Sequence, residues 1–556
     1  MAKNKAKIKI IPLGGVEEIG KNMTAIEYGN DIIVVDCGSM FPKEDLYGID
    51  LVIPDVTYLE KNIDKVRAFI ITHGHEDHIG AIPYVFNQVN VPIYCTRLTQ
   101  ALIENKLKEF KMQNNVKINC IKHKDVIKLG CFSIEFIKTN HSIAGATALA
   151  ITTPIGTIIH TGDFKVDYTP VDGDVIDLAT FASYGEKGVL LLMSDSTNAE
   201  RDGFTMSESK VGECFEKYFD EGAEKRIIIA TFASNVHRIQ QIIDCAEKHN
   251  RKVCFLGRSM ENVSKIASEL GELSVKSDTL ITADKAENMP KERVVIITTG
   301  SQGEPMSGLS RLATGDHSKI TLSRGDMVII SASPIPGNER MVYRVIDNLY
   351  RLGVVVIYKA LDAVHVSGHA CQEELKLILS LTKPKYFMPV HGEYRQLMQH
   401  AMLGEKLGMS SSNIFMPEVG KVLEITKDDA HFAGNVQSGV VMVDGLGIGD
   451  VGNVVLRDRK VLSQDGLVVV CITLSSFDAS LLTEPDIISR GFIYMKENED
   501  IILESKQLVQ DIIEGLRKDK LHDWAYIKNE IRRNLKEYLY TKTKRNPMIL
   551  PMIIEI

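Results

Sequence analysis

The sequence has few cysteines, and none of them is closely paired. Its nine cysteines are scattered over 556 residues, with no C-x-x-C pair among them. Disulfide-dense secreted domains and cysteine-based zinc sites need cysteines at short, regular spacings. We therefore expect reduced thiols in a cytoplasmic protein. The charged start, residues 1–7, also differs from the apolar segment of a signal peptide.

Long apolar runs and an excess of positive charge are missing as well. No run approaches the roughly 20 apolar residues that span a bilayer, so we expect no membrane association. Lysine and arginine total 65 against 73 aspartates and glutamates, a net charge of −8. This balance argues against a strongly basic coat for nucleic acid. It leaves open a local basic channel, or phosphate that is held mainly by metal ions.

The most informative stretch is 72–78, which reads Thr-His-Gly-His-Glu-Asp-His directly after an apolar run. A strand that ends in a tight, glycine-containing turn can aim His73 and His75 at one point. Asp77 and His78 can then serve a second point close by. Neutral imidazole and carboxylate are zinc ligands, and catalytic zinc sites usually keep one position for water. The pattern therefore predicts a metal site rather than a polar turn that happens to be rich in histidine.

Three further candidate ligands stand where an apolar strand meets a turn: His141, Asp163 and His391. A lone histidine after a strand is more often a packed or surface residue. The ordered set favours ligands, because each member lies at a strand end, where loops build sites.

This set resembles the ligand pattern of the metallo-β-lactamase fold. The resemblance implies two metal positions, and we expect two Zn²⁺ per subunit, with Mn²⁺ or Mg²⁺ as substitutes. Two ions that share a water lower its pKa and clamp the attacked group, which gives hydrolysis but leaves lactams, thioesters and phosphodiesters open. In the family's manner, one ion would be bound by His73, His75 and His141 and the other by Asp77, His78 and His391, with Asp163 bridging.

Strands and helices alternate to about residue 420, which is α/β patterning. Apolar strands are expected at 189–194, 226–232, 252–257 and 293–298, and an amphipathic helix at 235–249. The block between Asp195 and His365 has its own strand–helix rhythm and splits the ligand set, so it should fold as a cap over the cleft.

The composition changes after about residue 421, where glycines mark a turn-rich stretch. Strand-like 461–462 and 467–470 follow, and then long charged helices near 500–517 and 522–540. This pattern favours a separate small α+β domain.

The inserted block carries a second set of motifs. Ser-Asp-Ser-Thr-Asn at 194–198 resembles motif A of the β-CASP nucleases, His369 resembles their motif B, and His391 their motif C. The stretch 303–311 is also typical of that group. With the C-terminal extension, the chain resembles the bacterial ribonuclease J family over nearly its whole length. One departure is Ser-Ile-Ala-Gly-Ala at 142–146, where many relatives carry Pro-Asp-Ser after the isoleucine, and we transfer no role to it.

The resemblance implies an α/β fold: a metallo-β-lactamase αββα sandwich with an inserted β-CASP α/β domain and a small C-terminal α+β domain. We predict the sandwich at 1–205 and 366–425, the β-CASP domain at 206–365, a linker at 426–449 and the C-terminal domain, which we expect to be an oligomerisation module, at 450–556.

Two residues of the second motif set suit acid catalysis. Expulsion of the leaving group from a phosphodiester needs a proton donor opposite the attacking oxygen. His369 fits that need if Asp195 orients it, because a carboxylate raises the pKa of an imidazole and fixes its tautomer. Asp195 could also be a helix N-cap or an Asx turn, and His369 could be a helix cap.

A phosphate pocket is predicted where strand 226–232 meets helix 235–249. Free backbone N–H groups and the helix dipole favour an anion there, although Ser234 could equally be an ordinary N-cap. In ribonuclease J the corresponding segments hold the substrate's 5′ phosphate. The candidate substrate-binding residues are Ser234, Asn235, His365, Val366, Ser367, Gly368 and His369. A structural cation such as Ca²⁺ could also be held, as in some relatives, by Tyr47, Ile49 and Asp444, against the alternative of a solvated turn.

The resemblance implies a zinc-dependent ribonuclease that degrades 5′-monophosphate RNA in the 5′-to-3′ direction and also cuts internally, in RNA maturation and mRNA decay. One alternative is a DNA nuclease of the β-CASP family, whose repair branch tends to lack histidine at motif C. Another is a small-molecule hydrolase or a flavin-linked di-iron oxidoreductase. The oxidoreductases usually carry Glu in place of His75, together with a flavodoxin-like domain that this sequence does not resemble.

The implied partners are single-stranded RNA, a second copy or further copies of the chain, and an RNA-decay complex. The apolar tail 548–554 is a segment that a soluble monomer would not leave in water. It could pack within its own domain, or pair across subunits and make a homodimer or homotetramer.

Overall fold

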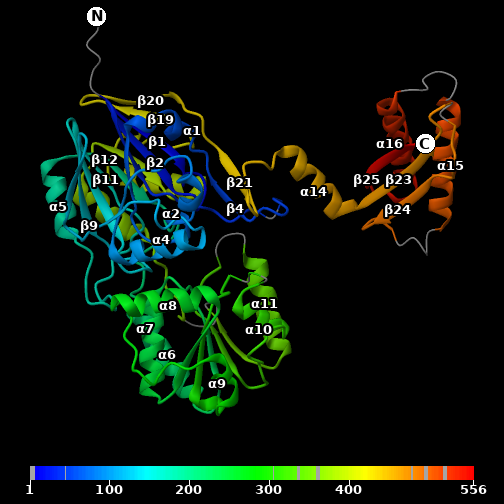
Figure 1. Ribbon diagram of the computed structural model, residues 1–556. Coiled ribbons are helices and arrows are strands. Elements are labelled where there is room, and N and C mark those ends of the chain that lie inside the picture. The colour runs from blue at the N-terminus through cyan, green and yellow to red at the C-terminus, as the bar shows by residue number, and fades with distance from the viewer. Residues whose placement is uncertain are drawn as a thin grey trace, which may run out of the picture. The chain divides into compact units, whose positions relative to one another are not determined.

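The computed structural model describes residues 7–43, 45–302, 304, 306–334, 338–358, 363–477, 480–493, 499–516 and 523–556. It forms two compact units (Figure 1). The first contains the chain up to Phe41 together with Val52–Val441, and the second contains Pro42–Leu51 and Met442–Ile556.

Two sheets form the sandwich of the first unit. The larger has the strand order β20 (Ala430–Asn435), β19 (Lys421–Ile425), β1 (Ile8–Gly14), β2 (Met23–Tyr28), β3 (Asp31–Val35), β5 (Val66–Ile70), β6 (Ile93–Cys95) and β7 (Ile118–Cys120). The smaller has the order β18 (Tyr386–Val390), β12 (Val189–Asp195), β11 (Gly156–His160), β10 (Thr147–Thr153), β9 (Phe132–Lys138) and β8 (Val126–Leu129).

The core lies between these sheets, where alternate residues of both face inward. Ile26 and Ile70 of one sheet share a buried cluster with Phe136 and Leu191 of the other. Helices α5 (Leu178–Lys187), α12 (Gln372–Thr382) and α13 (Tyr394–Lys406) pack on the outer face of the smaller sheet. In the connections of the larger sheet, α1 (Thr57–Lys61) precedes β5, α2 (Glu76–Ile79) and α3 (Ile82–Val85) lie between β5 and β6, and α4 (Arg97–Glu109) lies between β6 and β7. The predicted αββα sandwich is confirmed.

The inserted β-CASP part is a parallel sheet with helices on both faces. Its strand order is β14 (Lys252–Leu256), β15 (Val294–Thr298), β13 (Ile227–Ala230), β16 (Met327–Ile330) and β17 (Val355–Tyr358). The strands are continuous apolar runs because both faces are buried. One face packs on α6 (Ser209–Glu221), α7 (Val236–Lys248) and α8 (Arg258–Leu270), the other on α9 (Ala283–Asn288), α10 (Gly308–Thr314) and α11 (Glu339–Arg351), green in Figure 1. The expected strands and helix agree with these bounds to within a few residues.

The second unit has a sheet with the order β24 (Asp486–Arg490), β23 (Leu467–Leu474) and β25 (Met548–Glu555). Helices α15 (Glu499–Leu516) and α16 (Trp524–Thr543) cover one face of it, with Val509 and Ile531 in the shared core. The predicted small α+β domain is confirmed. The remaining elements are β4 (Leu51–Pro54), β21 (Val440–Asp444), β22 (Gly447–Ile448), α14 (Asn453–Asp465) and the short 3-10 turns at Ile63–Lys65, Lys291–Arg293 and Ser411–Asn413.

One expectation for the C-terminal part needs correction, and one of two stated alternatives is observed. Val461 and Leu462 lie in helix α14 rather than in a strand, because two apolar residues among charged helix formers do not set a strand period. The tail 548–554 pairs in parallel with β23 of the same chain, with Met548 opposite Leu467. The tail therefore packs within its own domain instead of depending on a second subunit for a partner strand.

The segment expected to be a linker, 426–449, includes strand β20, which pairs antiparallel with β19 at the edge of the larger sheet. Among the helices described above, none is long and apolar enough to cross a membrane.

Candidate metal centre and substrate site

The histidine-rich turn follows β5 and leads into the short helix α2. His73 lies in the extended loop, His75 directly precedes the helix, and Asp77 and His78 lie within it. Backbone hydrogen bonds hold the turn in place, since Asn22 N donates to Asp77 O at 3.0 Å and Cys37 N donates to His78 O at 2.8 Å. The turn is therefore fastened to the ends of the neighbouring strands.

One group of possible ligands consists of histidines only. His75 Nδ1 lies 3.1 Å from His73 Nε2 and 3.2 Å from His141 Nε2. Burial lowers the pKa of His75 to about 4 and, with His75 as a neighbour, that of His141 to about 3. His141 donates from Nδ1 to Gly368 O at 2.7 Å, which leaves Nε2 as an acceptor for a cation.

The second group is a mixture of histidines and carboxylates. Asp163 Oδ2 lies 3.2 Å from His391 Nε2 and 3.3 Å from His78 Nε2, and Asp77 Oδ2 lies 3.5 Å from the same His78 nitrogen. Burial lowers the pKa of His391, but Asp163 outweighs it and raises the value to about 9. Burial in turn raises the pKa of Asp163, but His391 and His78 outweigh it and hold that pKa well below its usual range.

Asp163 reaches both groups. Its Oδ2 atom is 3.7 Å from His73 Nε2 and 3.8 Å from His141 Nε2, in addition to the shorter contacts with the second group. Within each group, the ligand atoms all lie within 4.8 Å of one another. Buried imidazole and carboxylate at this spacing fit divalent cations. The arrangement therefore brings together all seven ligands expected from the sequence.

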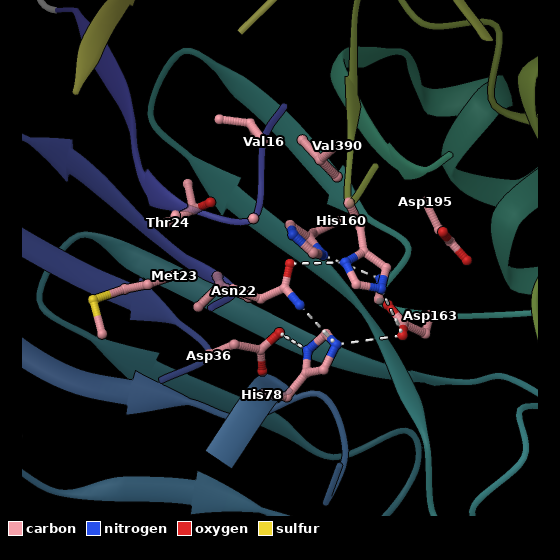
Figure 2. A pocket seen from close by; sticks show the side chains of 15 residues that line it. Val16, Asn22, Met23, Thr24, Asp36, His78, His160, Asp163, Asp195 and Val390 are labelled. Carbon is pink, nitrogen blue, oxygen red and sulfur yellow. Dashed lines mark hydrogen bonds and ion pairs between the residues drawn. The ribbon is translucent and has the colours of Figure 1, made fainter. Parts of the chain in front are cut away.

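Two residues that orient the ligands were missed in the sequence. His78 donates from Nδ1 to Asp36 Oδ2 at 2.8 Å (Figure 2), and His391 donates from Nδ1 to Asn22 Oδ1 at 2.9 Å. Both contacts direct Nε2 of the histidine toward Asp163. Such outer partners fix the tautomer of a metal-binding histidine. The available signal was that Asp36 also follows an apolar strand, β3, in the layout shared by the other ligands.

His369 and Asp195 form a further pair beside the cluster. His369 Nδ1 donates to Asp195 Oδ2 at 2.8 Å, and the His369 ring centroid lies 5.0 Å from that of His141. Burial lowers the pKa of His369, but Asp195 outweighs it, and the net pKa is raised above the usual value. Asp195 also accepts from Thr197 N at 2.9 Å, so an Asx-type turn and the contact with His369 coexist.

The candidate phosphate-binding residues lie on two segments. Asn235 is the N-cap of α7, because its side chain accepts from Arg238 N, and Ser234 precedes it. The second segment is 363–369, where His365, Ser367 and His369 are half-buried while Val366 and Gly368 are buried. A Cβ at position 368 would lie 2.8 Å from His141, so only glycine allows this close approach.

The residues expected to hold a structural cation have partners within the chain. Arg459 donates from Nη1 to Tyr47 O and Gly48 O at 3.1 Å, and from Nη2 to the Asp444 carboxylate. Two of the groups expected to hold Ca²⁺ are therefore already bonded to a guanidinium of the same chain. Ile49, the third residue expected to hold the cation, takes no part in these bonds.

In the stretch 303–311, which is typical of the β-CASP nucleases, Gly303 and Pro305 lie outside the described residues, and Ser307 caps α10.

Family models match most of the chain. The model described as "Metallo-beta-lactamase superfamily" matches residues 17–206, and "Ribonuclease J, beta-CASP domain" matches 224–349. "Zn-dependent metallo-hydrolase RNA specificity domain" matches 353–417, and "Ribonuclease J C-terminal domain" matches 454–556.

Curated relatives match over the full length. "Ribonuclease J2" of Bacillus subtilis is 43% identical and covers 100% of both chains. "Ribonuclease J 1" of Streptococcus pyogenes is 46% identical over 99% of this chain and 98% of its own. "Ribonuclease J" of Thermus thermophilus is 44% identical over 99% of this chain and 95% of its own. A solved structure from Enterococcus faecalis, titled as a protein of unknown function, has a TM-score of 0.54 at 19% identity and covers 76% of this chain and 100% of its own, which concerns the fold alone.

Proposed function

The chain belongs to the ribonuclease J family, and from that premise we propose that it degrades RNA in two modes. A metal-dependent ribonuclease is what the family and the buried His/Asp clusters indicate together. The proposed modes are 5′-to-3′ exonuclease action on 5′-monophosphate RNA and internal cleavage. Both would serve RNA maturation and mRNA decay in the cytoplasm.

We propose that the two ligand groups hold two Zn²⁺, with Asp163 shared between them, and that Mn²⁺ or Mg²⁺ can substitute. When bound, such ions lower the pKa of water and stabilise negative charge on the attacked phosphate. The histidine-only group supplies neutral imidazoles without any change of protonation. The DNA nuclease reading is disfavoured because His391 lies in the cluster.

His369 is proposed as the proton donor to the leaving oxygen. The Asp195 carboxylate raises the pKa of this imidazole and accepts its Nδ1 proton, so in the protonated ring Nε2–H is the group that faces away from Asp195. With Asp163 and His391 the pair also forms a third group of possible ligand atoms, but neither of the two proposed ion positions needs it.

The observation that carries the exonuclease mode is the half-buried row His365, Ser367 and His369 on one side of the 363–369 segment. It leads from the proposed acid to the start of α7, where the helix dipole favours an anion. A compact, singly phosphorylated end would fit there, while a triphosphate would add bulk and charge.

Matched RNAs test the proposal. One sequence would be prepared with a 5′ monophosphate, a 5′ triphosphate and as a covalent circle, alongside the same sequence in single-stranded DNA and a chromogenic lactam. We expect mononucleotides from the 5′-monophosphate RNA, and only internal products from the triphosphate and the circle. Equal mononucleotide release from both linear ends would contradict the 5′ mode, and faster cleavage of DNA or lactam would contradict the substrate class.

We also propose that the chain forms a dimer or tetramer through its second unit. With β23 as its inner neighbour, β25 is an edge strand that leaves Leu550, Met552 and Ile554 exposed by 45%, 48% and 51%. An exposed apolar edge favours pairing with another copy. Deleting 450–556 should reduce the particle to a monomer in light scattering while its metal content is kept. A truncated protein of unchanged oligomeric state would refute the proposal, and an RNA-decay complex would then need another surface.

A further inference from the structure

A fully buried arginine lies behind the proposed phosphate pocket. Arg238, in the first turn of α7, has no exposed surface, and its Nη1 lies 2.8 Å from His365 Nδ1. A guanidinium can only donate hydrogen bonds. His365 Nδ1 must therefore accept, which makes the ring neutral and places its single N–H on Nε2. The arginine thus decides which face of the imidazole is a donor.

Ser367 is arranged in the same way. Its Oγ accepts from Asn198 Nδ2 at 2.8 Å and from His369 N at 3.2 Å. A hydroxyl oxygen has two acceptor lone pairs and one donor hydrogen. Since both lone pairs are used, the remaining capacity of Ser367 is to donate its O–H.

The charge of Arg238 is balanced within the protein. Its Nε and Nη2 atoms contact the two oxygens of Glu208 at 2.7 and 2.8 Å, and Nη1 also donates to Ser331 O at 2.8 Å. The side chain has therefore no free charge to offer a ligand and does not reach one. Glu208 N in turn donates to Asp167 Oδ2, four residues after the shared ligand Asp163.

We propose that Arg238 and Asn198 are positioning residues which turn His365 and Ser367 into obligate hydrogen-bond donors, so that the pocket selects a terminal phosphate over a terminal hydroxyl. This inference rests on the proposed function, in which the pocket takes the 5′ end of RNA. A phosphate offers only acceptor oxygens, and two fixed donors match them. A 5′ hydroxyl is smaller and neutral, so hydrogen bonds from the two donors to it are weaker than the charge-assisted bonds to a phosphate.

The arginine is tested with a variant that removes both buried charges, Arg238→Gln with Glu208→Gln, because loss of one partner would leave a buried charge unpaired. We expect the ratio of kcat/KM for 5′-monophosphate RNA to that for 5′-hydroxyl RNA to fall by roughly 10- to 100-fold, the worth of hydrogen bonds to a charged group. The matched control is Arg226→Gln with Asp326→Asn, another buried pair of the inserted domain, with Nη2 2.7 Å from Oδ2. The control should keep the wild-type ratio. If the first double variant does not fold, Arg238→Lys, which keeps the charge but loses the fork, takes its place.

Asn198→Asp tests the serine with almost no change in shape. An aspartate accepts where the asparagine donated, so it would draw the Ser367 hydroxyl inward and lower the same ratio. Because Asn198 also donates to His369 O at 2.9 Å, the control is Thr205→Val, which removes the other bond to that carbonyl, at 2.7 Å, without touching Ser367. An equal fall in the control would contradict the role of Ser367.

A readout that does not depend on catalysis is the tautomer of His365. In protein labelled with ¹⁵N-histidine, the His365 Nδ1 signal should have the chemical shift of an unprotonated ring nitrogen, and the Arg238 variant should shift it toward a mixture of tautomers. A wild-type ring protonated at Nδ1 would overturn the proposal.

Further variants distinguish a misplaced pocket from a wrong role for Arg238 and Asn198. If His365→Ala combined with Ser367→Ala keeps the preference for the 5′ monophosphate, the pocket itself is misplaced and the proposed function is wrong at this point. If that variant loses the preference while the Arg238 and Asn198 variants keep it, the pocket stands and only the positioning inference fails.

Discussion

The histidines of the centre fall into two kinds, and the difference follows from their neighbours. His75 and His141 face other histidines, and burial keeps their pKa values near 4 and 3, so they are neutral. His78, His391 and His369 each face a carboxylate, and their pKa values are raised although burial opposes this. Burial alone therefore does not decide the protonation of an imidazole, because the adjacent charge decides it.

This contrast has a consequence for metal uptake. Ligands must be deprotonated before they bind a cation. The histidine-only group is ready at neutral pH, whereas the group around Asp163 must release protons. The raised pKa of His369 favours its protonated form, in agreement with a role in donating a proton.

The largest effect is expected from the removal of Asp163, the carboxylate that both ligand groups share. Asp163→Ala should lower single-turnover cleavage by about 10³-fold or more, since metal ions supply several kcal/mol to the reaction. Metal content should fall at both positions, whereas Asp77→Ala or His78→Ala should abolish cleavage but retain an ion at the histidine-only group. Elemental analysis of each purified variant measures this. If any of these three variants, freed of contaminating nucleases, kept wild-type activity, the two-metal assignment would be refuted.

Removal of the proton donor tests the histidine that lies outside both ligand groups. His369→Ala should lower the single-turnover rate by on the order of 10²–10⁴, the usual worth of a positioned acid. RNA binding and metal content should change much less. An unchanged chemical step would return His369 to a capping role.

A smaller effect is expected when Asp36, the carboxylate that accepts from His78 Nδ1, is changed. Asp36→Asn keeps the size of the side chain but weakens the partner of His78 Nδ1, so metal affinity should fall by roughly 10- to 100-fold. Asp31→Asn is the matched control, at the other end of β3, where the carboxylate contacts Arg67 at 2.6 Å. Competition with a chelator compares the two variants, and equal affinities would exclude the role assigned to Asp36.

The smallest effect concerns pH. Asp195 raises the pKa of His369, so the wild-type donor stays protonated until the pH rises through that raised value. In Asp195→Asn the largest opposing contribution to burial is lost, while Asp163 remains 3.9 Å from His369 Nδ1. The pKa therefore falls, and the alkaline fall in activity should begin at lower pH. Above the pKa, each unit of decrease removes about tenfold of the protonated form. A pH–rate profile with an unmoved alkaline limb would contradict the role of Asp195.

Much of the fold could be predicted because its signals are local. The continuous apolar runs at 227–230 and 294–298 indicate strands buried on both faces, and the observed strands coincide with them. Helix α14 was missed at 461–462 because two apolar residues carry no period. The direction in which the tail pairs was also open, since a strand pattern does not name its partner.

The sequence by itself determined which side chains could bind metal, because histidines and aspartates at strand ends need only the strand-and-turn pattern to be aimed at a common point. Only the tertiary structure decided which distant residues contact the residues of the site. Asp36 lies 42 residues from His78, and Arg238 lies 127 residues from His365. Arg459 takes the place expected for a cation, 15 residues beyond Asp444. Such partners meet only when distant segments pack, and no local pattern encodes a contact that depends on the position of a whole sheet.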